Sequence, residues 1–291
     1  MPNYSAGSEI PPSFEPESSL AHSVIAVCEP PAAPGPQTAG LERAGPDLEG
    51  APHISSRLEK DFEGVVGTTS VCGTDERLPV PDATKYPFSA ICFLEITFWD
   101  GSAEKNFIGT GFLYGTTVLY TSGHCIHDAQ FGFARRIRVY PGRNGDAIPF
   151  GVLTSSSFYV PPEWAASHGP DFDYGAILLP GPGFTHSKFF GMESRPTNYL
   201  VNEPVRTAGY PGDKPYATPW MVEGKVATAA PSRFFYMLDT MGGQSGSPVF
   251  TMNMYGFGNH FTLGIHSYGG CPNGSTRVIP QMLERLPTRA S

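Results

Sequence analysis

Three short segments of the chain contain residue types that hydrolyse acyl bonds by nucleophilic attack. His124 follows a strand-like run in TSGHC, Asp173 precedes one in DYGAILL, and Ser245 lies between glycines in GGQSGSPVF. A serine hydroxyl becomes a good nucleophile when an imidazole takes its proton, and a buried carboxylate fixes the tautomer of that imidazole. We therefore interpret His124 as the general base, Asp173 as its orienting carboxylate and Ser245 as the nucleophile.

The turn around Ser245 also suits the charge that develops during such a reaction. The tetrahedral intermediate carries an oxyanion that needs preset N–H donors, and we expect the backbone N–H groups of Gly243 and Ser245 to supply them. Each signal is common by itself, since a histidine before a cysteine is usually structural and Gly-x-Ser-Gly is often a simple turn. Their joint occurrence in this order favours catalysis. Asp171 competes with Asp173, but we interpret it as a solvated turn residue.

The segments between these motifs predict an all-β protein. From about residue 70, short apolar runs recur, and each is ended by Gly, Pro or Asn. This spacing is typical of sandwiches and barrels. The segment IPQMLERLP differs, because its apolar residues Ile279, Met282, Leu283 and Leu286 follow the period of a helix. We expect a short C-terminal helix there.

The first 69 residues differ in composition from the rest. They contain ten acidic and three basic residues, a net charge of −7 out of −8 for the chain, and they are rich in proline. We expect them to be largely disordered. No clustered basic face or long apolar run occurs, so we expect neither nucleic-acid binding nor a membrane span. The apolar run at residues 24–27 is too short for a signal peptide.

Taken together, TSGHC, DYGAILL and DTMGGQSGSPVF resemble the glutamyl endopeptidases, a bacterial and fungal branch of the chymotrypsin-like serine proteases. The likeness covers about residue 70 to the end, and SVCGTDERLPVPDATKYPF, VYPGRNG, AGYPGDK and NGSTRV agree with it. It implies two six-stranded antiparallel β-barrels of the chymotrypsin type, which we place at 70–182 and 183–291, with the triad in the cleft between them. It also implies a secreted zymogen whose propeptide, residues 1–69, is removed.

Two positions depart from related enzymes. Gln244 precedes the nucleophile, where trypsin-like enzymes carry an aspartate that captures the freed N-terminal amine. Gln244 cannot form that ion pair, so activation must work differently. Gly109 stands where several bacterial relatives have a cysteine that pairs with the one after the catalytic histidine, so Cys125 needs another partner or stays free.

Two substrate preferences compete at the specificity pocket. Asp239 lies where a trypsin-like enzyme places the carboxylate that binds Lys or Arg. Alternatively, Thr240 and His266 donate hydrogen bonds to a substrate glutamate, as the family pattern implies, and Ser267 lines the same pocket. We favour glutamate. Cutting before Ser70 or Val71 would then release an α-amine, on whichever of the two residues becomes the first, that completes the glutamate pocket.

The five cysteines allow several pairings. We expect Cys72–Cys271, which would hold the mature N-terminus beside the pocket, and Cys92–Cys125, which would tie an early strand to the turn carrying the histidine. Cys28 lies in the expected propeptide and should be free. Disulfides would indicate an oxidising compartment, and we expect an extracellular protein although no signal peptide is visible.

The remaining expectations concern partners and alternatives. We expect protein or peptide substrates, a monomer, no cofactor and no catalytic metal, since the chain contains no CxxC pair. The alternatives are trypsin-like cleavage through Asp239 and a non-catalytic binding protein on a protease scaffold. Such binding proteins usually lose a triad residue or the oxyanion turn, whereas this chain has kept both.

Overall fold

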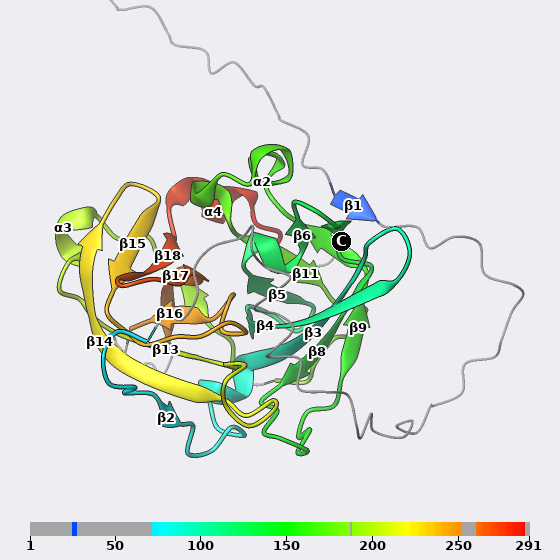
Figure 1. Ribbon diagram of the computed structural model, residues 1–291, viewed down its shortest axis with the longest axis horizontal. Coiled ribbons are helices and arrows are strands. Elements are labelled where there is room, and N and C mark those ends of the chain that lie inside the picture. Colours follow the sequence, from blue (N-terminus) through cyan, green and yellow to red (C-terminus); the bar gives the residue numbers. More distant parts are fainter. Residues whose placement is uncertain (1–24, 28–70, 187, 252–259, 289–291) are drawn as a thin grey trace, which may run out of the picture.

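The computed structural model describes residues 25–27, 71–186, 188–251 and 260–288. This part of the chain is mostly β and forms two barrels, which lie side by side in Figure 1. The predicted all-β class is therefore confirmed. Most of the predicted propeptide, including Cys28, lies outside the described residues, so its predicted disorder stays a prediction.

The first barrel is a sheet in the order β10-β11-β5-β4-β3-β8-β9, and the short strand β1 pairs with β10. β9 and β10 are almost continuous in the chain. β9 pairs with β8 and β10 pairs with β11, so one bent segment joins both ends of the sheet. The bounds are β1 Ile25–Val27, β3 Ile91–Trp99, β4 Glu104–Leu113, β5 Val118–Thr121, β8 Arg136–Pro141, β9 Leu153–Ser155, β10 Ser157–Tyr159 and β11 Gly175–Leu178.

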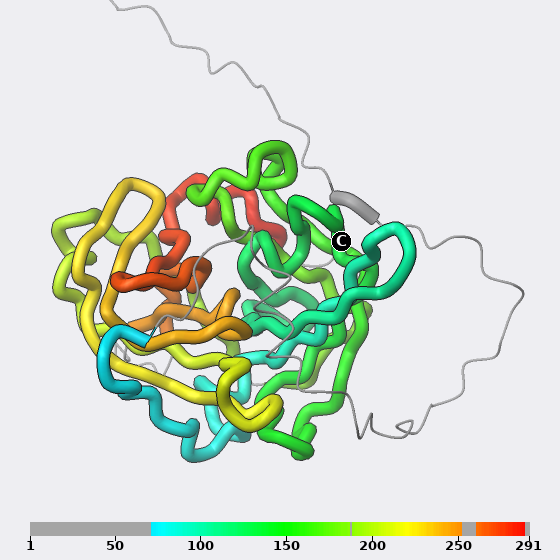
Figure 2. The backbone as a smooth tube through the Cα atoms, in the orientation of Figure 1, coloured from blue at the N-terminus to red at the C-terminus, as the bar shows by residue number. Residues whose placement is uncertain are grey.

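The second barrel is a closed ring of six strands in the order β13-β14-β15-β18-β17-β16. β12 adds to β17, and β2, from the segment ahead of the first barrel, adds to β14. Figure 2 shows this N-terminal segment in cyan beside the yellow β14. The bounds are β2 Leu78–Pro79, β12 Gly191–Met192, β13 Pro204–Gly209, β14 Trp220–Ala229, β15 Arg233–Tyr236, β16 Pro248–Phe250, β17 Phe261–Tyr268 and β18 Asn273–Arg277.

Aromatic side chains pack the two barrels against each other. Phe93 on β3 meets the ring of Tyr210, which follows β13, edge to face at 5.2 Å, and both residues are buried. Such a pair adds about 0.5 to 1.5 kcal/mol to the free energy of burial. The hydroxyl of Tyr210 donates to the carbonyl of Arg143, back in the first barrel, at 3.0 Å. The barrels are thus joined by both apolar and polar contacts.

The predicted C-terminal helix is confirmed as α4, Pro280–Arg285. Proline suits the first helical position because its missing N–H would have no helical acceptor there. Met282 and Leu286 are buried in the core of the first barrel, and Tyr120 of that barrel donates to the carbonyl of Pro287 at 3.0 Å. The chain therefore returns to the first barrel after completing the second, as the red helix in Figure 1 shows.

Short elements complete the fold at the ends of the strands. β6 and β7 form a two-stranded ribbon. The 3-10 turn η2 contains His124, and the 3-10 turn η3 directly precedes Asp173. The bounds are β6 His127–Asp128, β7 Gly132–Phe133, α2 Pro162–Ser167, α3 Thr197–Leu200, η1 Phe88–Ala90, η2 Gly123–Cys125 and η3 Pro170–Phe172.

One predicted disulfide is confirmed and the other is wrong. Cys72 and Cys271 are bridged, whereas Cys92 and Cys125 are both buried and free. The reason lies in the direction that Cys125 faces. A Cβ atom built on Gly109 of β4 would lie 3.1 Å from the sulfur of Cys125. The thiol therefore points at the glycine of β4 and not at Cys92 on β3.

This contact predicts that a disulfide can be engineered. Oxidised Gly109→Cys should bridge to Cys125 and gain up to about 3 kcal/mol in free energy of unfolding over its reduced form, because the bridge restricts the unfolded chain. Peptide mapping without reduction and denaturant unfolding measure both effects. Gly109→Ala, which adds the Cβ atom without a thiol, is the control. Reactive thiols at both position 109 and Cys125 in the oxidised variant would contradict the prediction, whereas Cys92 should stay free in either case.

Candidate active site

His124 and Asp173 are joined by two hydrogen bonds. His124 lies in η2, directly after β5, and Asp173 lies between η3 and β11. The backbone N–H of His124 donates to Oδ1 of Asp173 at 2.9 Å, and Nδ1 of its ring lies 2.8 Å from Oδ2. Asp173 is fully buried, while 14% of the His124 side chain is exposed. An ionised carboxylate only accepts, so Nδ1 carries a proton in either form of the ring, and Nε2 has a free lone pair when the ring is neutral.

Residues of the second barrel hold Asp173 in place. Its carbonyl accepts the hydroxyl of Thr276 on β18 at 3.0 Å and the hydroxyl of Ser267 on β17 at 3.3 Å. Ser267 is buried, and its hydroxyl also lies 3.2 Å from that of Ser122, two residues before His124. The side chain of Ser267 therefore bridges the turns that carry His124 and Asp173. Its predicted role in substrate binding stays a prediction.

Asp171 is placed differently from Asp173. It is exposed, and its carboxylate pairs with Nε of Arg233 at 2.9 Å. The preference for Asp173 over Asp171 in the sequence thus agrees with their surroundings.

Ser245 lies in a tight loop that requires glycine on both sides. Gly243 and Gly246 have φ angles of 97° and 89°, a region that side chains rarely adopt. A Cβ atom on Gly246 would lie 2.0 Å from the carbonyl oxygen of Thr110 on β4. The N–H of Thr110 donates to the carbonyl of Ser245 at 2.8 Å, and its hydroxyl donates to the carbonyl of Gly243 at 2.8 Å.

The same loop lies beside the turn that carries His124. The thiol of Cys125 donates to the carbonyl of Ser245 at 3.7 Å. Cys125 directly follows His124, so this contact brings the loop of the second barrel to the histidine of the first. Ser245 itself is partly exposed. The three residues predicted as a triad therefore gather where the two barrels meet.

The surroundings of His124 favour its charged form. Burial lowers the pKa of the imidazole, but the Asp173 carboxylate beside it outweighs burial, and the pKa rises well above the ordinary value of a histidine. A histidine that becomes a stable imidazolium is suited to accept a proton during a reaction.

His266 is buried on β17, and its surroundings favour its neutral form. Its Nδ1 lies 2.7 Å from the hydroxyl of Tyr236, which in turn lies 2.8 Å from the hydroxyl of Ser275. Burial, together with the nearby His124, lowers the pKa of His266 to about 3. His266 is therefore neutral near pH 7. Tyr236 lies within the apolar strand FFYM, where no sequence signal marks it as a functional residue.

Thr240 and Asp239 precede the Ser245 loop. Thr240 is fully buried, and its hydroxyl has no hydrogen-bond partner in the part of the chain that the structure describes. Both oxygens of the Asp239 carboxylate are occupied, because they accept the backbone N–H groups of Cys72 and Glu76 at 2.8 Å each. Asp239 thus holds the segment that begins beside Val71.

Comparisons with known proteins identify the family. No family model matches the chain. The glutamyl endopeptidase of Bacillus licheniformis is 36% identical over 224 residues, which cover 75% of this chain and 68% of that protein. The chain belongs to the glutamyl endopeptidase family. The sequence resemblance to this family is thereby confirmed.

Other relatives extend this comparison. A Bacillus subtilis protein named extracellular metalloprotease is 32% identical over 79% of this chain and 72% of that protein. Among the residues described here, no group of three or more His, Cys, Asp or Glu side chains is placed to hold a metal ion. A solved structure of a Glu endopeptidase in complex with MPD has a TM-score of 0.63 and 26% identity, covering 74% of this chain and 96% of that one. This glutamyl endopeptidase homologue is a chymotrypsin-like serine endopeptidase.

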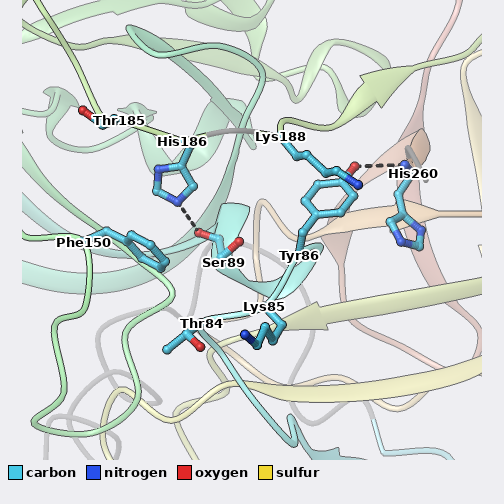
Figure 3. A pocket seen from close by; sticks show the side chains of 9 residues that line it. All are labelled: Thr84, Lys85, Tyr86, Ser89, Phe150, Thr185, His186, Lys188 and His260. Carbon is cyan, nitrogen blue, oxygen red and sulfur yellow. Dashed lines mark hydrogen bonds between the residues drawn. The ribbon is translucent and has the colours of Figure 1, made fainter. Parts of the chain in front are cut away.

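A separate hollow of about 630 Å³ opens elsewhere on the endopeptidase. No residue of the predicted triad or specificity pocket lines it. In Figure 3, His186 donates to the carbonyl of Ser89, and the Tyr86 hydroxyl accepts the N–H of His260. The hollow is lined by Thr84, Lys85, Tyr86, Ser89, Phe150, Thr185, His186, Lys188 and His260.

Among the described helices, none has the length and apolar character that crossing a membrane requires.

The contact between His124 and Asp173 predicts how the histidine titrates. In the free enzyme, NMR should show the His124 imidazole losing its proton above the ordinary range of about pH 6.5. Asp173→Asn removes the negative charge while burial remains, so the pKa should fall below that range. Ser245→Ala is the control and should leave the pKa raised. An unchanged pKa in Asp173→Asn would contradict the assigned cause.

Proposed function

We propose that this endopeptidase cleaves peptide bonds after glutamate, and after aspartate less well, through an acyl-enzyme formed by Ser245. The observation that carries the proposal is the doubly hydrogen-bonded pair of His124 and Asp173 beside the Ser245 loop. Cleavage after Lys or Arg through Asp239 is disfavoured, because backbone N–H groups already occupy that carboxylate.

In the proposed reaction, Nε2 of His124 removes the proton of the Ser245 hydroxyl as its oxygen attacks the substrate carbonyl. Asp173 holds the ring and stabilises the imidazolium that forms. The oxyanion accepts hydrogen bonds from the backbone N–H groups of Gly243 and Ser245. The described residues provide no other acceptor for these two N–H groups. The imidazolium then protonates the leaving amine, and water attacks the acyl-enzyme by the same path.

The proposed glutamate pocket rests on two groups with unused hydrogen-bonding capacity. The buried hydroxyl of Thr240 is an unsatisfied donor. With the Tyr236 hydroxyl donating to its Nδ1, neutral His266 presents Nε2–H to the substrate carboxylate. Burial without a partner costs the Thr240 hydroxyl about 1 to 3 kcal/mol, and a bound glutamate would recover that free energy.

Maturation remains part of the proposal. Cutting before Ser70 or Val71, with residues 1–69 as a propeptide, would leave a positively charged α-amine at Ser70 or Val71, ahead of Cys72. The Cys72–Cys271 disulfide and the Asp239 carboxylate hold the next residue near β17, the strand that carries His266. The amine would then add the positive charge that neutral His266 cannot supply. We also propose that the first barrel spans residues 70–182 and the second spans residues 183–291.

The location of the enzyme and its oligomeric state are also part of the proposal. We propose an extracellular enzyme, because a disulfide suits an oxidising compartment and the name of the Bacillus subtilis relative places that protein outside the cell. The substrates are proteins or peptides, as expected of an endopeptidase, and we propose that the enzyme acts as a monomer.

The assignment of the nucleophile predicts covalent labelling. A small alkyl fluorophosphonate should modify wild-type enzyme at Ser245, and mass spectrometry should locate the adduct there. Ser245→Ala should remain unlabelled and lose peptide hydrolysis by about a millionfold, with its thermal unfolding unchanged. Asp171→Asn is the control and should label at the wild-type rate. Peptide hydrolysis by Ser245→Ala within tenfold of wild type would refute the assignment.

The unpartnered hydroxyl of Thr240 predicts a selective loss. Thr240→Val keeps the shape but removes the donor, so kcat/KM for glutamate peptides should fall by about 10-fold or more, the value of a hydrogen bond to a charged group. Matched peptides with glutamine before the cut should change less. The folded protein should become more stable, since an unsatisfied buried group is lost. Equal effects on both peptides would argue against contact with the carboxylate.

A further inference from the structure

Arg77 is a buried cation outside the proposed triad, and its N–H groups all have acceptors. Its side chain is fully shielded from solvent. Nε and Nη2 donate to the two oxygens of Asp75 at 2.9 Å each, and Nη1 and Nη2 donate to those of Asp213 at 2.9 and 2.6 Å. A longer contact of 3.5 Å runs from Nη1 to Oε1 of Gln244. A guanidinium has five N–H donors, so Arg77 is saturated.

The charges around Arg77 balance within the cluster. Nζ of Lys214 lies 2.8 Å from Oδ2 of Asp75, so two cations face two carboxylates. The paired guanidinium and Lys214 lower the pKa of Asp75 strongly, although burial opposes this. A buried guanidinium held by two bidentate carboxylates has a fixed orientation. Its remaining contact, to Gln244, is therefore directed and not incidental.

Gln244 connects this cluster to the Ser245 loop. It is fully buried and directly precedes Ser245. Its Oε1 also accepts the backbone N–H of Met241 at 3.0 Å, and its own N–H donates to the carbonyl of Met241 at 3.0 Å. One side-chain oxygen thus closes the turn from Met241 to Gln244 and meets Arg77. Gly243, one of the proposed oxyanion donors, lies within that turn.

Further hydrogen bonds hold the loop 239–245 to its neighbours. Asp239, ahead of the loop, accepts the N–H groups of Cys72 and Glu76. The N–H of Gly212, next to Asp213, donates to the carbonyl of Gly242 at 2.7 Å. The loop 239–245 is therefore held to the segment 72–77 through Asp239 and to the segment 212–213 through Gly242.

We propose that Arg77 is a positioning residue that holds the oxyanion turn in its active shape by fixing Gln244. It takes the place of the freed amine that trypsin-like enzymes place against the residue before the nucleophile. Arg77 is an internal side chain, and its contacts exist in the uncut chain, so the turn forms without cleavage. Propeptide removal then serves the substrate pocket alone. The inference rests on the proposed function of Ser245.

Phosphonylation of Ser245 in the full-length chain tests this inference. A small alkyl fluorophosphonate places its P=O oxygen in the oxyanion hole and needs no glutamate pocket. Arg77→Met should lower the saturating rate of labelling at least tenfold, toward the loss of about 100- to 1000-fold that follows removal of an oxyanion donor. The reagent concentration at half-saturation should change little, because binding precedes use of the turn.

Arg195 provides the matched control. It is also buried and held by two carboxylates, those of Glu193 and Glu203, but lies outside the Ser245 loop. Arg195→Met should lower the unfolding temperature comparably to Arg77→Met, while labelling stays within about twofold of wild type. Rates are compared below the lowest unfolding temperature, so that loss of fold does not contribute.

A second variant leaves the ion cluster intact. Gln244→Leu keeps the pairs of Arg77 with Asp75 and Asp213 but removes the acceptor, so it should slow labelling as Arg77→Met does. Gln244→Glu restores the acceptor and should recover most of the rate. Labelling of Arg77→Met and Gln244→Leu within twofold of Arg195→Met would overturn the inference alone. Wild-type protein that is never labelled at Ser245 would overturn the inference and the proposed function together.

Discussion

The site depends on a close backbone contact between the barrels. The N–H of Thr110 on β4 donates to the carbonyl of Ser245, and the carbonyl of Thr110 lies so near Gly246 that a Cβ atom there would come within 2.0 Å. β4 belongs to the first barrel, whereas the loop belongs to the second. This contact therefore fixes Ser245 of the second barrel relative to His124 of the first, and no larger residue than glycine would allow it.

Two histidines near this contact have opposite proton affinities. Burial lowers the pKa of both, but His124 touches the Asp173 carboxylate and its pKa is raised, whereas His266 touches the neutral Tyr236 hydroxyl and its pKa falls to about 3. The same side chain thus favours its charged form at one position and its neutral form at the other. In a nearly dry interior, the contacting group decides the protonation state.

The N-terminal segment, residues 72–77, contacts the second barrel both through its backbone and disulfide and through the side chain of Arg77. The Asp239 carboxylate and the disulfide hold its backbone, while Arg77 reaches the residue before the nucleophile. Trypsin-like enzymes gain their positioning charge by cleavage. Here the positioning charge is a side chain already neutralised by two carboxylates, so it is present in the uncut chain. Under the proposed role of Arg77, propeptide cleavage would serve only the substrate pocket.

The sequence by itself determined the features that depend on neighbouring residues. The motifs around His124, Asp173 and Ser245, the all-β class and the helical period before Leu286 are local patterns. The Cys72–Cys271 pair was also predicted, from the expected position of the mature N-terminus. The local patterns required no knowledge of how distant segments pack, whereas the Cys72–Cys271 prediction depended on the fold that the family resemblance implies.

Only the tertiary structure decided which side chains meet across long separations. Cys125 faces Gly109 and not Cys92, because the turn directs its thiol toward β4. Arg77 reaches Asp213, 136 residues later, because β2 pairs with β14 of the second barrel. Such meetings depend on strand register and barrel packing, and neither composition nor local period specifies them.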